Sequence, residues 1–238
     1  MITLHHLNNS RSQRILWLLE ELGLEYETQT HYRDPKTGLA PQSLRDIFPL
    51  GRSPVLTIQA NEQSEPIVLA ESGAIVEYLC QQYNEKQLCV NADENVFKDY
   101  LFWMHFTEGT LMPPLIANLV MGKAKAKKKP IFVNAIANKV IDAILDAYYN
   151  PNHATNIALV KAHLVQQRAN GSEFMIGDRL TAVDIMMLFP LEALVATGSN
   201  NIDSSIKHYV QTMQSRPAYQ AALVRGGEYD FGPKDKVA

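Results

Sequence analysis

The chain has 238 residues, which is enough for one large or two modest domains that each bury a core. With 46% hydrophobic and 20% charged residues, its composition is that of an ordinary globular protein. The formal net charge of −3 argues against nucleic acid as the main partner, because phosphate binding needs a basic surface.

Cys80 and Cys89 are the only cysteines, and neither belongs to a C-x-x-C or other metal-type spacing. We therefore expect no disulfide framework, no zinc site and a reducing cytoplasm as the location. Near the first residues no basic segment precedes an apolar run, and nowhere do about 18 apolar residues follow one another. We expect neither a signal peptide nor a membrane span.

Residues 2–7 are expected to form the first strand. Its histidines, His5 and His6, are neighbours that face opposite sides of a strand, so they cannot easily ligate one metal ion, and we expect no metal. A turn at residues 8–10 follows, and either Ser10 or Ser12 can cap the next helix.

A helix is expected after this turn, since apolar residues recur at helical spacing and Gly23 offers a left-handed end. These residues are Ile15, Leu18, Leu19 and Leu22. Residues 24–28 form a plausible second strand, which makes a right-handed βαβ unit with parallel strands. A short helix is expected over residues 41–48.

Residues 51–79 predict a β-hairpin followed by a helix. The β-branched runs 55–58 and 67–69 flank the turn-forming segment 61–66, and apolar residues then recur at helical spacing from Ile75.

The expected helix start at Glu71 and Ser72 has two possible interpretations, one as a binding site and one as a structural helix start. Free N–H groups there suit a carboxylate and the Glu71 side chain suits an ammonium, so together they could hold an amino acid head group. The Ser53-Pro54 bond can be cis and turns main-chain groups outward, where a peptide backbone could pair. In the alternative, Ser72 caps the helix, Glu71 favours its dipole and Pro54 starts a strand.

The segments Ser53-Pro54-Val55-Leu56 and Glu71-Ser72-Gly73-Ala74-Ile75 resemble the glutathione-holding signature of the glutathione transferase family, in which the proline is cis. The order β-α-β-α-β-β-α over residues 1–83 is similar to the thioredoxin-like domain of that family. The resemblance is closest to a fungal and bacterial branch that carries Asn/His-Ser-Arg at the first loop. It implies an α/β domain at residues 1–83 and an all-helical domain at residues 92–225.

The resemblance also implies the site. Ser10 lies where theta-like members keep a thiol-activating serine, with Ser12 as its rival and Arg11 or main-chain N–H groups as further alternatives. The implied glutathione-binding residues are Arg52, Ser53, Pro54, Glu71 and Ser72. Helical residues near position 100 face the second substrate in the family, which makes Tyr100, Trp103 and Met112 candidates for an apolar wall. Core packing is the alternative for each aromatic residue.

The second half shows helical spacing throughout. The lysine-rich residues 123–129 are expected to form a solvated loop or helix end. An amphipathic helix is expected over 134–149 and another helix over 156–169. Thr181 and Asp184 predict a capping box, which makes Asp184 structural. Arg216-Pro217-Ala218-Tyr219 closes the last helical region, and residues from Gly226 on are expected to form a mobile polar tail.

The expected activity is conjugation of the glutathione thiolate to electrophilic, mostly apolar compounds. A serine in place of a cysteine at position 10 leaves the glutathione sulfur as the only nucleophile. Peroxidase activity on organic hydroperoxides uses the same thiolate. The alternative is a non-catalytic module that binds hydrophobic ligands or protein partners. The family resemblance also implies a homodimer.

Overall fold

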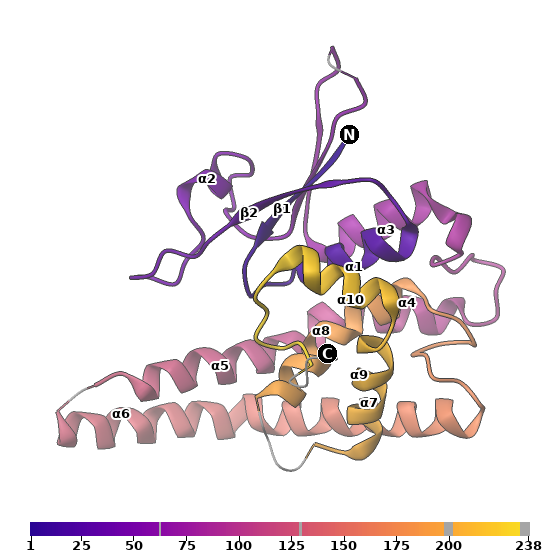
Figure 1. Ribbon diagram of the computed structural model, residues 1–238. Helices are drawn as coiled ribbons and strands as arrows, with labels where there is room; N and C mark the ends of the chain where they lie inside the picture. The colour runs from indigo at the N-terminus through magenta and orange to yellow at the C-terminus, as the bar shows by residue number, and fades with distance from the viewer. Residues whose placement is uncertain (62, 129, 198–201, 234–238) are drawn as a thin grey trace.

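The computed structural model describes residues 1–61, 63–128, 130–197 and 202–233 (Figure 1). Its first half alternates strands and helices, and its second half is helical. The first half contains β1 (Ile2–Leu7), α1 (Gln13–Leu22), β2 (Glu27–His31), α2 (Gln42–Arg45), β3 (Val55–Ile58), β4 (Ile67–Ala70), α3 (Ser72–Gln82) and the 3₁₀ turn η1 (Asn84–Lys86). The second half contains α4 (Phe97–Phe106), the π-helical turn η2 (Thr107–Leu111), α5 (Met112–Ala126), α6 (Ile131–Ile144), the π-helical turn η3 (Leu145–Tyr149), α7 (Asn150–Ala169), α8 (Ala182–Ala196), α9 (Ser204–Gln214) and α10 (Pro217–Gly226).

The four strands form one mixed sheet in the order β2-β1-β3-β4. The expected parallel βαβ unit and the antiparallel hairpin are both confirmed. The second strand was expected over residues 24–28 and instead begins at Glu27. Residues 23–26 instead form the turn that ends α1. Gly23 adopts a left-handed conformation and the Leu24 N–H donates to the Leu19 carbonyl. The Tyr26 hydroxyl then donates to the Glu20 carboxylate.

The short helix expected over residues 41–48 covers only Gln42–Arg45. Pro49 lacks the N–H that a continuing helix requires, and it disfavours helical geometry in the residue before it. The chain turns after α2 instead, and Gly51 N–H closes that turn on the Phe48 carbonyl.

Helices α1 and α8 form the centre of the molecule. In Figure 1, α1 and α3 lie between the sheet and the helical half, and both contact α8. Nearly every residue of α8 is buried, as expected for a helix that is apolar on all sides. One continuous hydrophobic core therefore joins the sheet half to the helical half, while the boundaries proposed at residues 83 and 92 stay predictions.

The helices expected separately over 134–149 and 156–169 are one continuous rod from Ile131 to Ala169. Pro151 does not break the rod, and it lies just after the π-helical turn η3, where the regular α-helical hydrogen-bond pattern is already interrupted. The expected apolar stripe is present but exposed: Ile136, Val140 and Ile144 are 64%, 54% and 43% exposed. Helices α5 and α6 project together as an arm (Figure 1).

The lysine-rich segment forms the C-terminal end of α5, as expected, and Lys125 makes an ion pair with Asp142 of α6. Basic side chains at this end interact favourably with the negative pole of the helix dipole. Residue 129, the last of that run, lies outside the described residues.

The expectation of a mobile polar tail from Gly226 on is wrong for residues 226–233, and residues 234–238 lie outside the described part. Helix α10 extends beyond the expected last helical region, to Gly226. After it, Tyr229 donates to Glu192 and the Asp230 N–H donates to the Asn9 side chain at 2.8 Å. These hydrogen bonds and the partly buried ring of Tyr229 hold the segment against the first loop of the chain.

Cys80 and Cys89 are buried free thiols. Among the described residues no group of three His, Cys, Asp or Glu side chains is arranged to hold a metal ion. Across residues 1–61, 63–128, 130–197 and 202–233, none of the helices combines the length and apolar character that crossing a membrane requires.

Candidate functional site

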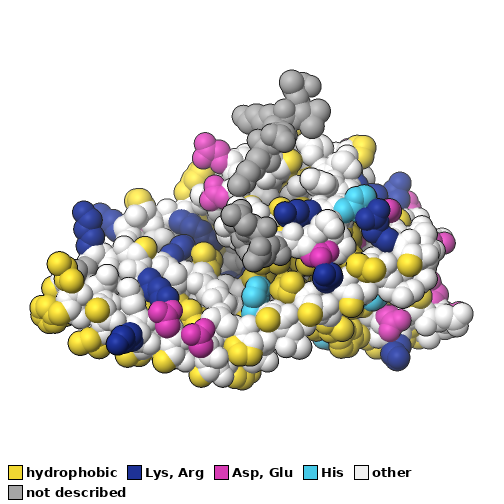
Figure 2. Space-filling model, turned by 90° about the horizontal axis from the view of Figure 1, so that it is seen from below, with side chains coloured by type: hydrophobic (Ala, Val, Ile, Leu, Met, Phe, Trp, Pro, Cys, Tyr) yellow, Lys and Arg dark blue, Asp and Glu magenta, His cyan; other side chains and the backbone are white. Residues whose placement is uncertain are grey.

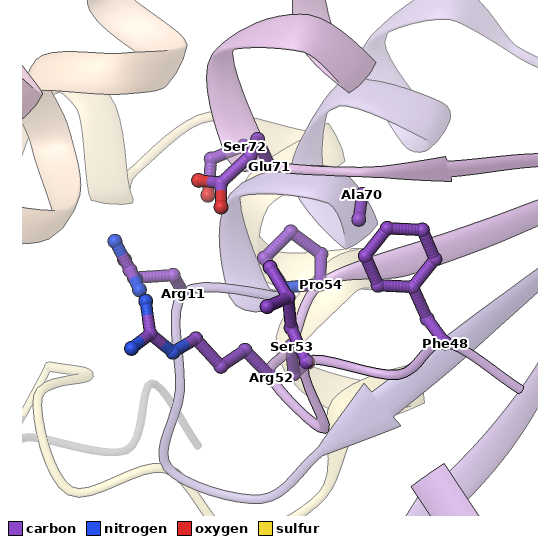
Figure 3. A pocket seen from close by; sticks show the side chains of 9 residues that line it. Arg11, Phe48, Arg52, Ser53, Pro54, Ala70, Glu71 and Ser72 are labelled. Atoms are coloured by element: carbon purple, nitrogen blue, oxygen red, sulfur yellow. The ribbon is translucent and has the colours of Figure 1, made fainter. Parts of the chain in front are cut away.

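A pocket lies where the loop after β1, the loop before β3 and the start of α3 meet (Figure 3). It is lined by Arg11, Phe48, Leu50, Arg52, Ser53, Pro54, Ala70, Glu71 and Ser72. Six of these are residues that the sequence singled out; Phe48, Leu50 and Ala70 were missed, and their apolar types alone carried no signal for a site. In Figure 3 the charged ends of Arg11, Arg52 and Glu71 project into the same open space.

The loop before β3 is shaped by two local features. Gly51 has a φ of +55°, and a Cβ there would lie 2.4 Å from Cγ of Arg45, so this close turn requires glycine. The Ser53-Pro54 peptide is cis, as the family resemblance implied. Together these features turn Arg52 outward, where it is exposed, and hold Ser53 and Pro54 buried against the sheet.

The start of α3 leaves its polar side chains without internal partners. Ser72 is the first helical residue rather than the cap, and its Oγ is buried with no hydrogen-bond partner among the described residues. Glu71 precedes it with a φ of 72°, an uncommon value for a residue with a side chain, and its side chain is exposed. The reading of Ser72 as a helix cap is therefore wrong, and its buried hydroxyl is free to meet a ligand.

Ser10 lies directly behind the pocket wall and is 6% exposed. Its Oγ is 2.8 Å from Oγ of Ser12 and 3.4 Å from Oγ of Ser53, which lines the pocket. It also accepts the backbone N–H of Ser12 at 3.2 Å. The structure thus brings Ser10 and Ser53, which are 43 residues apart, into one hydroxyl cluster.

Ser12 was one of the two serines that could cap α1 with a side chain, and the structure shows no such cap. Although Ser12 occupies the capping position, its hydroxyl makes no cap and points inward to Nδ1 of His6 at 2.8 Å. Ser12 is fully buried, so Ser10 stands between it and the pocket. The role of His6 was missed because only the tertiary fold brings its ring to Ser12.

Arg11 is held by a carboxylate from the helical half. Its guanidinium pairs with Glu108 at 2.8 Å, and the fully buried Arg14 pairs with the same carboxylate. Burial raises the pKa of Glu108, but Arg14 and Arg11 outweigh burial and hold that pKa below its usual range. Glu108 therefore stays ionised and fixes Arg11 at the edge of the pocket, a role that the sequence spacing gave no reason to expect.

Tyr100, Trp103 and Met112 are each less than a tenth exposed, and none of them lines this pocket. Tyr100 and Trp103 belong to the core, where α4 packs against α8. Their assignment to a substrate wall stays a prediction.

Comparison with known proteins agrees with this geometry. Residues 10–82 match the family model "Glutathione S-transferase, N-terminal domain". The chain is 31% identical over 224 residues to Glutathione S-transferase 1 of Saccharomyces cerevisiae, covering 93% of this chain and 94% of that protein. It is 32% identical to Glutathione S-transferase 3 of Schizosaccharomyces pombe, covering 93% and 86%. Among solved structures, a glutathione S-transferase from Actinobacillus pleuropneumoniae matches with a TM-score of 0.73 and 29% identity, covering 95% and 93%. A glutathione transferase homolog from Lodderomyces elongisporus, solved with two GSH per subunit, matches with a TM-score of 0.72 and 22% identity, covering 94% and 97%.

Proposed function

Because the chain belongs to the glutathione S-transferase family and is a glutathione transferase enzyme, we propose that its pocket binds glutathione and that Ser10 stabilises the glutathione thiolate for attack on an apolar electrophile. The observation that carries this proposal is the buried hydroxyl of Ser72, which has no partner among the described residues and lies beside the free carboxylate of Glu71. The homolog solved with two GSH per subunit supports the choice of ligand.

Each polar group of glutathione has a partner in this arrangement. Glu71 takes the ammonium of the γ-glutamyl head, and Ser72 with the first N–H groups of α3 takes its carboxylate. The main chain of Ser53, held by the cis peptide to Pro54, pairs with the cysteinyl amide. Arg52 takes the glycyl carboxylate.

The thiol then lies next to Ser10. A thiol with an ordinary pKa near 8.5 is only a few per cent ionised at neutral pH, so the site must favour the anion. A lowering of about two units corresponds to roughly 2.7 kcal/mol, which a few charge-assisted hydrogen bonds can supply. The thiolate attacks the electrophilic carbon, a C–S bond forms, and the leaving group departs with its electron pair.

The test is the thiolate absorbance of the enzyme–glutathione complex as a function of pH. Ser10→Ala should raise the pKa of bound glutathione and lower the transfer rate at neutral pH, with partial recovery at alkaline pH. An unshifted curve in Ser10→Ala beside a raised pKa in Ser12→Ala would assign the role to Ser12. Two unshifted curves would assign it to main-chain N–H groups or to Arg11.

Two related activities are separated by other assays. Turnover of an activated aryl halide, together with retention on immobilised glutathione, supports the transferase, and retention without turnover supports a module that only binds. In a peroxidase reaction the thiolate attacks a hydroperoxide oxygen, the O–O bond breaks and an alcohol leaves. A second glutathione then displaces the sulfenic oxygen as water and forms the disulfide. A panel of hydroperoxides and electrophiles decides between these substrates.

We also propose a cytoplasmic homodimer that detoxifies such compounds. The buried free thiols Cys80 and Cys89 suit a reducing compartment. Large apolar side chains are exposed on α5 and α6, and Figure 2 shows hydrophobic side chains gathered at the end of the molecule that these helices form. They include Leu119, Val120, Ile131, Phe132 and Ile136. Light scattering at micromolar concentration should give twice the chain mass of 26.7 kDa, and a monomer mass would contradict the dimer.

A further inference from the structure

A chain of polar side-chain contacts runs from the pocket wall into the core and ends on the C-terminal part of the protein. It joins Ser53, Ser10, Ser12 and His6 by side chain contacts of 3.4, 2.8 and 2.8 Å. The far side of the His6 ring hydrogen-bonds to the backbone of Gly226, at the end of α10. The proposed function uses only the Ser10 end of this chain.

The partners at its two ends fix which group donates to which. Burial lowers the pKa of His6 to about 4, against the Gly226 hydrogen bond and with help from His31, so the ring is neutral at physiological pH. Its single N–H donates to the Gly226 carbonyl, and Nδ1 is left as an acceptor. The Ser12 hydroxyl also lies 3.3 Å from the Leu7 carbonyl, but its contact with Nδ1 is shorter, at 2.8 Å. Because Nδ1 needs a donor, Ser12 gives its only hydroxyl proton to the imidazole.

The remaining protons follow in order. The Ser53 hydroxyl donates to the backbone carbonyl of His5 at 3.3 Å. Since the Ser12 proton lies on the imidazole, the 2.8 Å contact between Ser10 and Ser12 needs Ser10 as its donor. Ser10 is also the donor in the longer, 3.4 Å contact with Ser53, and its single proton favours the shorter contact. The Ser12 proton is donated to an imidazole and the Ser53 proton to a carbonyl, whereas the Ser10 proton is donated to another hydroxyl. A hydroxyl is the weakest of these three acceptors, so the hydrogen bond from Ser10 is the easiest of the three to break.

We propose that His6 and Ser12 are positioning residues that hold the Ser10 hydroxyl proton away from the pocket until glutathione has bound as a thiol. This inference rests on the proposed contact between Ser10 and the glutathione sulfur. With its proton on Ser12, the Ser10 oxygen faces the thiol as an acceptor. Once the thiol proton has passed to water in the open pocket, Ser10 rotates and donates to the thiolate, because an anion is a stronger acceptor than a neutral hydroxyl.

The same geometry could instead suggest a relay that carries the thiol proton through Ser10 and Ser12 to His6. The low pKa of His6 argues against such a relay. Transfer from a thiol of ordinary pKa near 8.5 to an imidazole with a pKa near 4 is unfavourable by more than about 10⁴-fold. His6 therefore acts as a fixed acceptor and not as a base.

The C-terminal segment maintains this arrangement. Gly226 lies so close to α1 that a Cβ there would be 2.8 Å from Leu16 and Gln13, which keeps its carbonyl at the His6 ring. Beyond it, Tyr229 is tied to Glu192 and Asp230 to Asn9, the residue before Ser10. The segment thus contacts both ends of the Ser10 loop.

The test compares the pKa of bound glutathione in the unmodified enzyme, in Ser12→Ala, in Ser10→Ala and in the double variant. Ser12→Ala removes the acceptor that competes for the Ser10 proton, so it should lower this pKa and give about fivefold more thiolate at pH values below it. The double variant should match Ser10→Ala alone, because Ser12 acts only through Ser10.

An unchanged or raised pKa in Ser12→Ala overturns the inference, as does an effect of Ser12→Ala that persists without Ser10. An unshifted pKa in Ser10→Ala instead defeats the proposed role of Ser10 as the group that stabilises the thiolate. The proton assignment is also tested in the unmodified enzyme, whether or not the variants fold. Nitrogen chemical shifts of His6 should show a protonated Nε2 and a bare Nδ1, and a protonated Nδ1 overturns the inference.

Discussion

Two helices of this protein begin with a hydroxyl residue and an acid, and the two starts are used differently. At the start of α8, Asp184 accepts hydrogen bonds from the Thr181 N–H at 2.9 Å, the Met175 N–H at 2.8 Å and the Tyr209 hydroxyl at 2.9 Å. The predicted capping box is confirmed. At the start of α3, the Ser72 hydroxyl has no partner among the described residues and the Glu71 side chain is exposed.

The difference shows that residue type alone does not distinguish a structural helix start from a binding one. What distinguishes them is whether the protein itself satisfies the polar groups. Asp184 is buried and its donors come from the loop before α8 and from α9, so it stabilises the fold. Glu71 and Ser72 face a pocket, so their unused capacity is available to a ligand. Variants of the two sites should therefore separate stability from binding.

The largest effect is expected for Asp184→Ala. Removing the carboxylate leaves the buried donors of Met175, Thr181 and Tyr209 unpaired, and the free energy of unfolding should fall by about 4 kcal/mol. Thermal or denaturant unfolding measures this loss. Asp178→Ala, in the same loop but exposed, is the matched control and should change stability by less than about 0.5 kcal/mol. Equal losses in both variants would contradict the structural role.

The next effect concerns Glu192, a second enclosed acid of α8. Burial raises its pKa to about 7, although hydrogen bonds from Tyr219, Tyr229 and Gln214 oppose the shift. Between pH 4.5 and 7 the folded state then holds a proton that the unfolded state has lost. Stability is therefore greatest at the acid end of this window and falls by about 3 kcal/mol as the pH rises through it.

Glu192→Gln should flatten this part of a plot of unfolding free energy against pH. Asp184, whose pKa burial raises to about 6, still contributes its own pH dependence in the variant, over a window that ends at a lower pH than that of Glu192. If the slope of the plot is the same with and without Glu192, this acid does not bind its extra proton on folding.

At the open site, Glu71→Gln should weaken glutathione binding about tenfold or more, because a charge-assisted contact with an ammonium is lost. The free energy of unfolding should stay within about 0.5 kcal/mol of the parent value. Calorimetric titration with glutathione gives the affinity. Glu65→Gln makes the same charge change at an exposed residue outside the pocket and should leave affinity intact. Unchanged affinity in Glu71→Gln would return Glu71 to a purely structural role.

The smallest effect is expected for Ser72→Ala, which should change stability and glutathione affinity in opposite directions. The hydroxyl has no internal partner, so its removal should raise stability by up to about 1 kcal/mol, while glutathione affinity falls several-fold. Ser204→Ala changes the first residue of α9 in the same way at an exposed position and serves as the control. A loss of stability in Ser72→Ala would mean that the hydroxyl does serve the helix.

Much of the fold could be predicted from the sequence because it depends on local patterns. Apolar spacing from Ile15 to Leu22 with Gly23 behind it located α1, β-branched runs located β3 and β4, and Thr181 with Asp184 located the start of α8. Boundaries were wrong where a neighbouring contact overrides propensity, as at Tyr26, whose packing on Glu20 delays β2.

The sequence by itself determined the family, the order of elements over residues 1–83 and the candidate binding residues at the start of α3, since all of these depend on short-range spacing. Only the tertiary structure decided which polar groups are already satisfied. Ser12 turned inward because β1 carries His6 beneath it, and Tyr229 is held because α8 presents Glu192 to it. Such pairings join residues far apart in the chain. They decide whether a hydroxyl forms a hydrogen bond within the protein or stays available to a ligand.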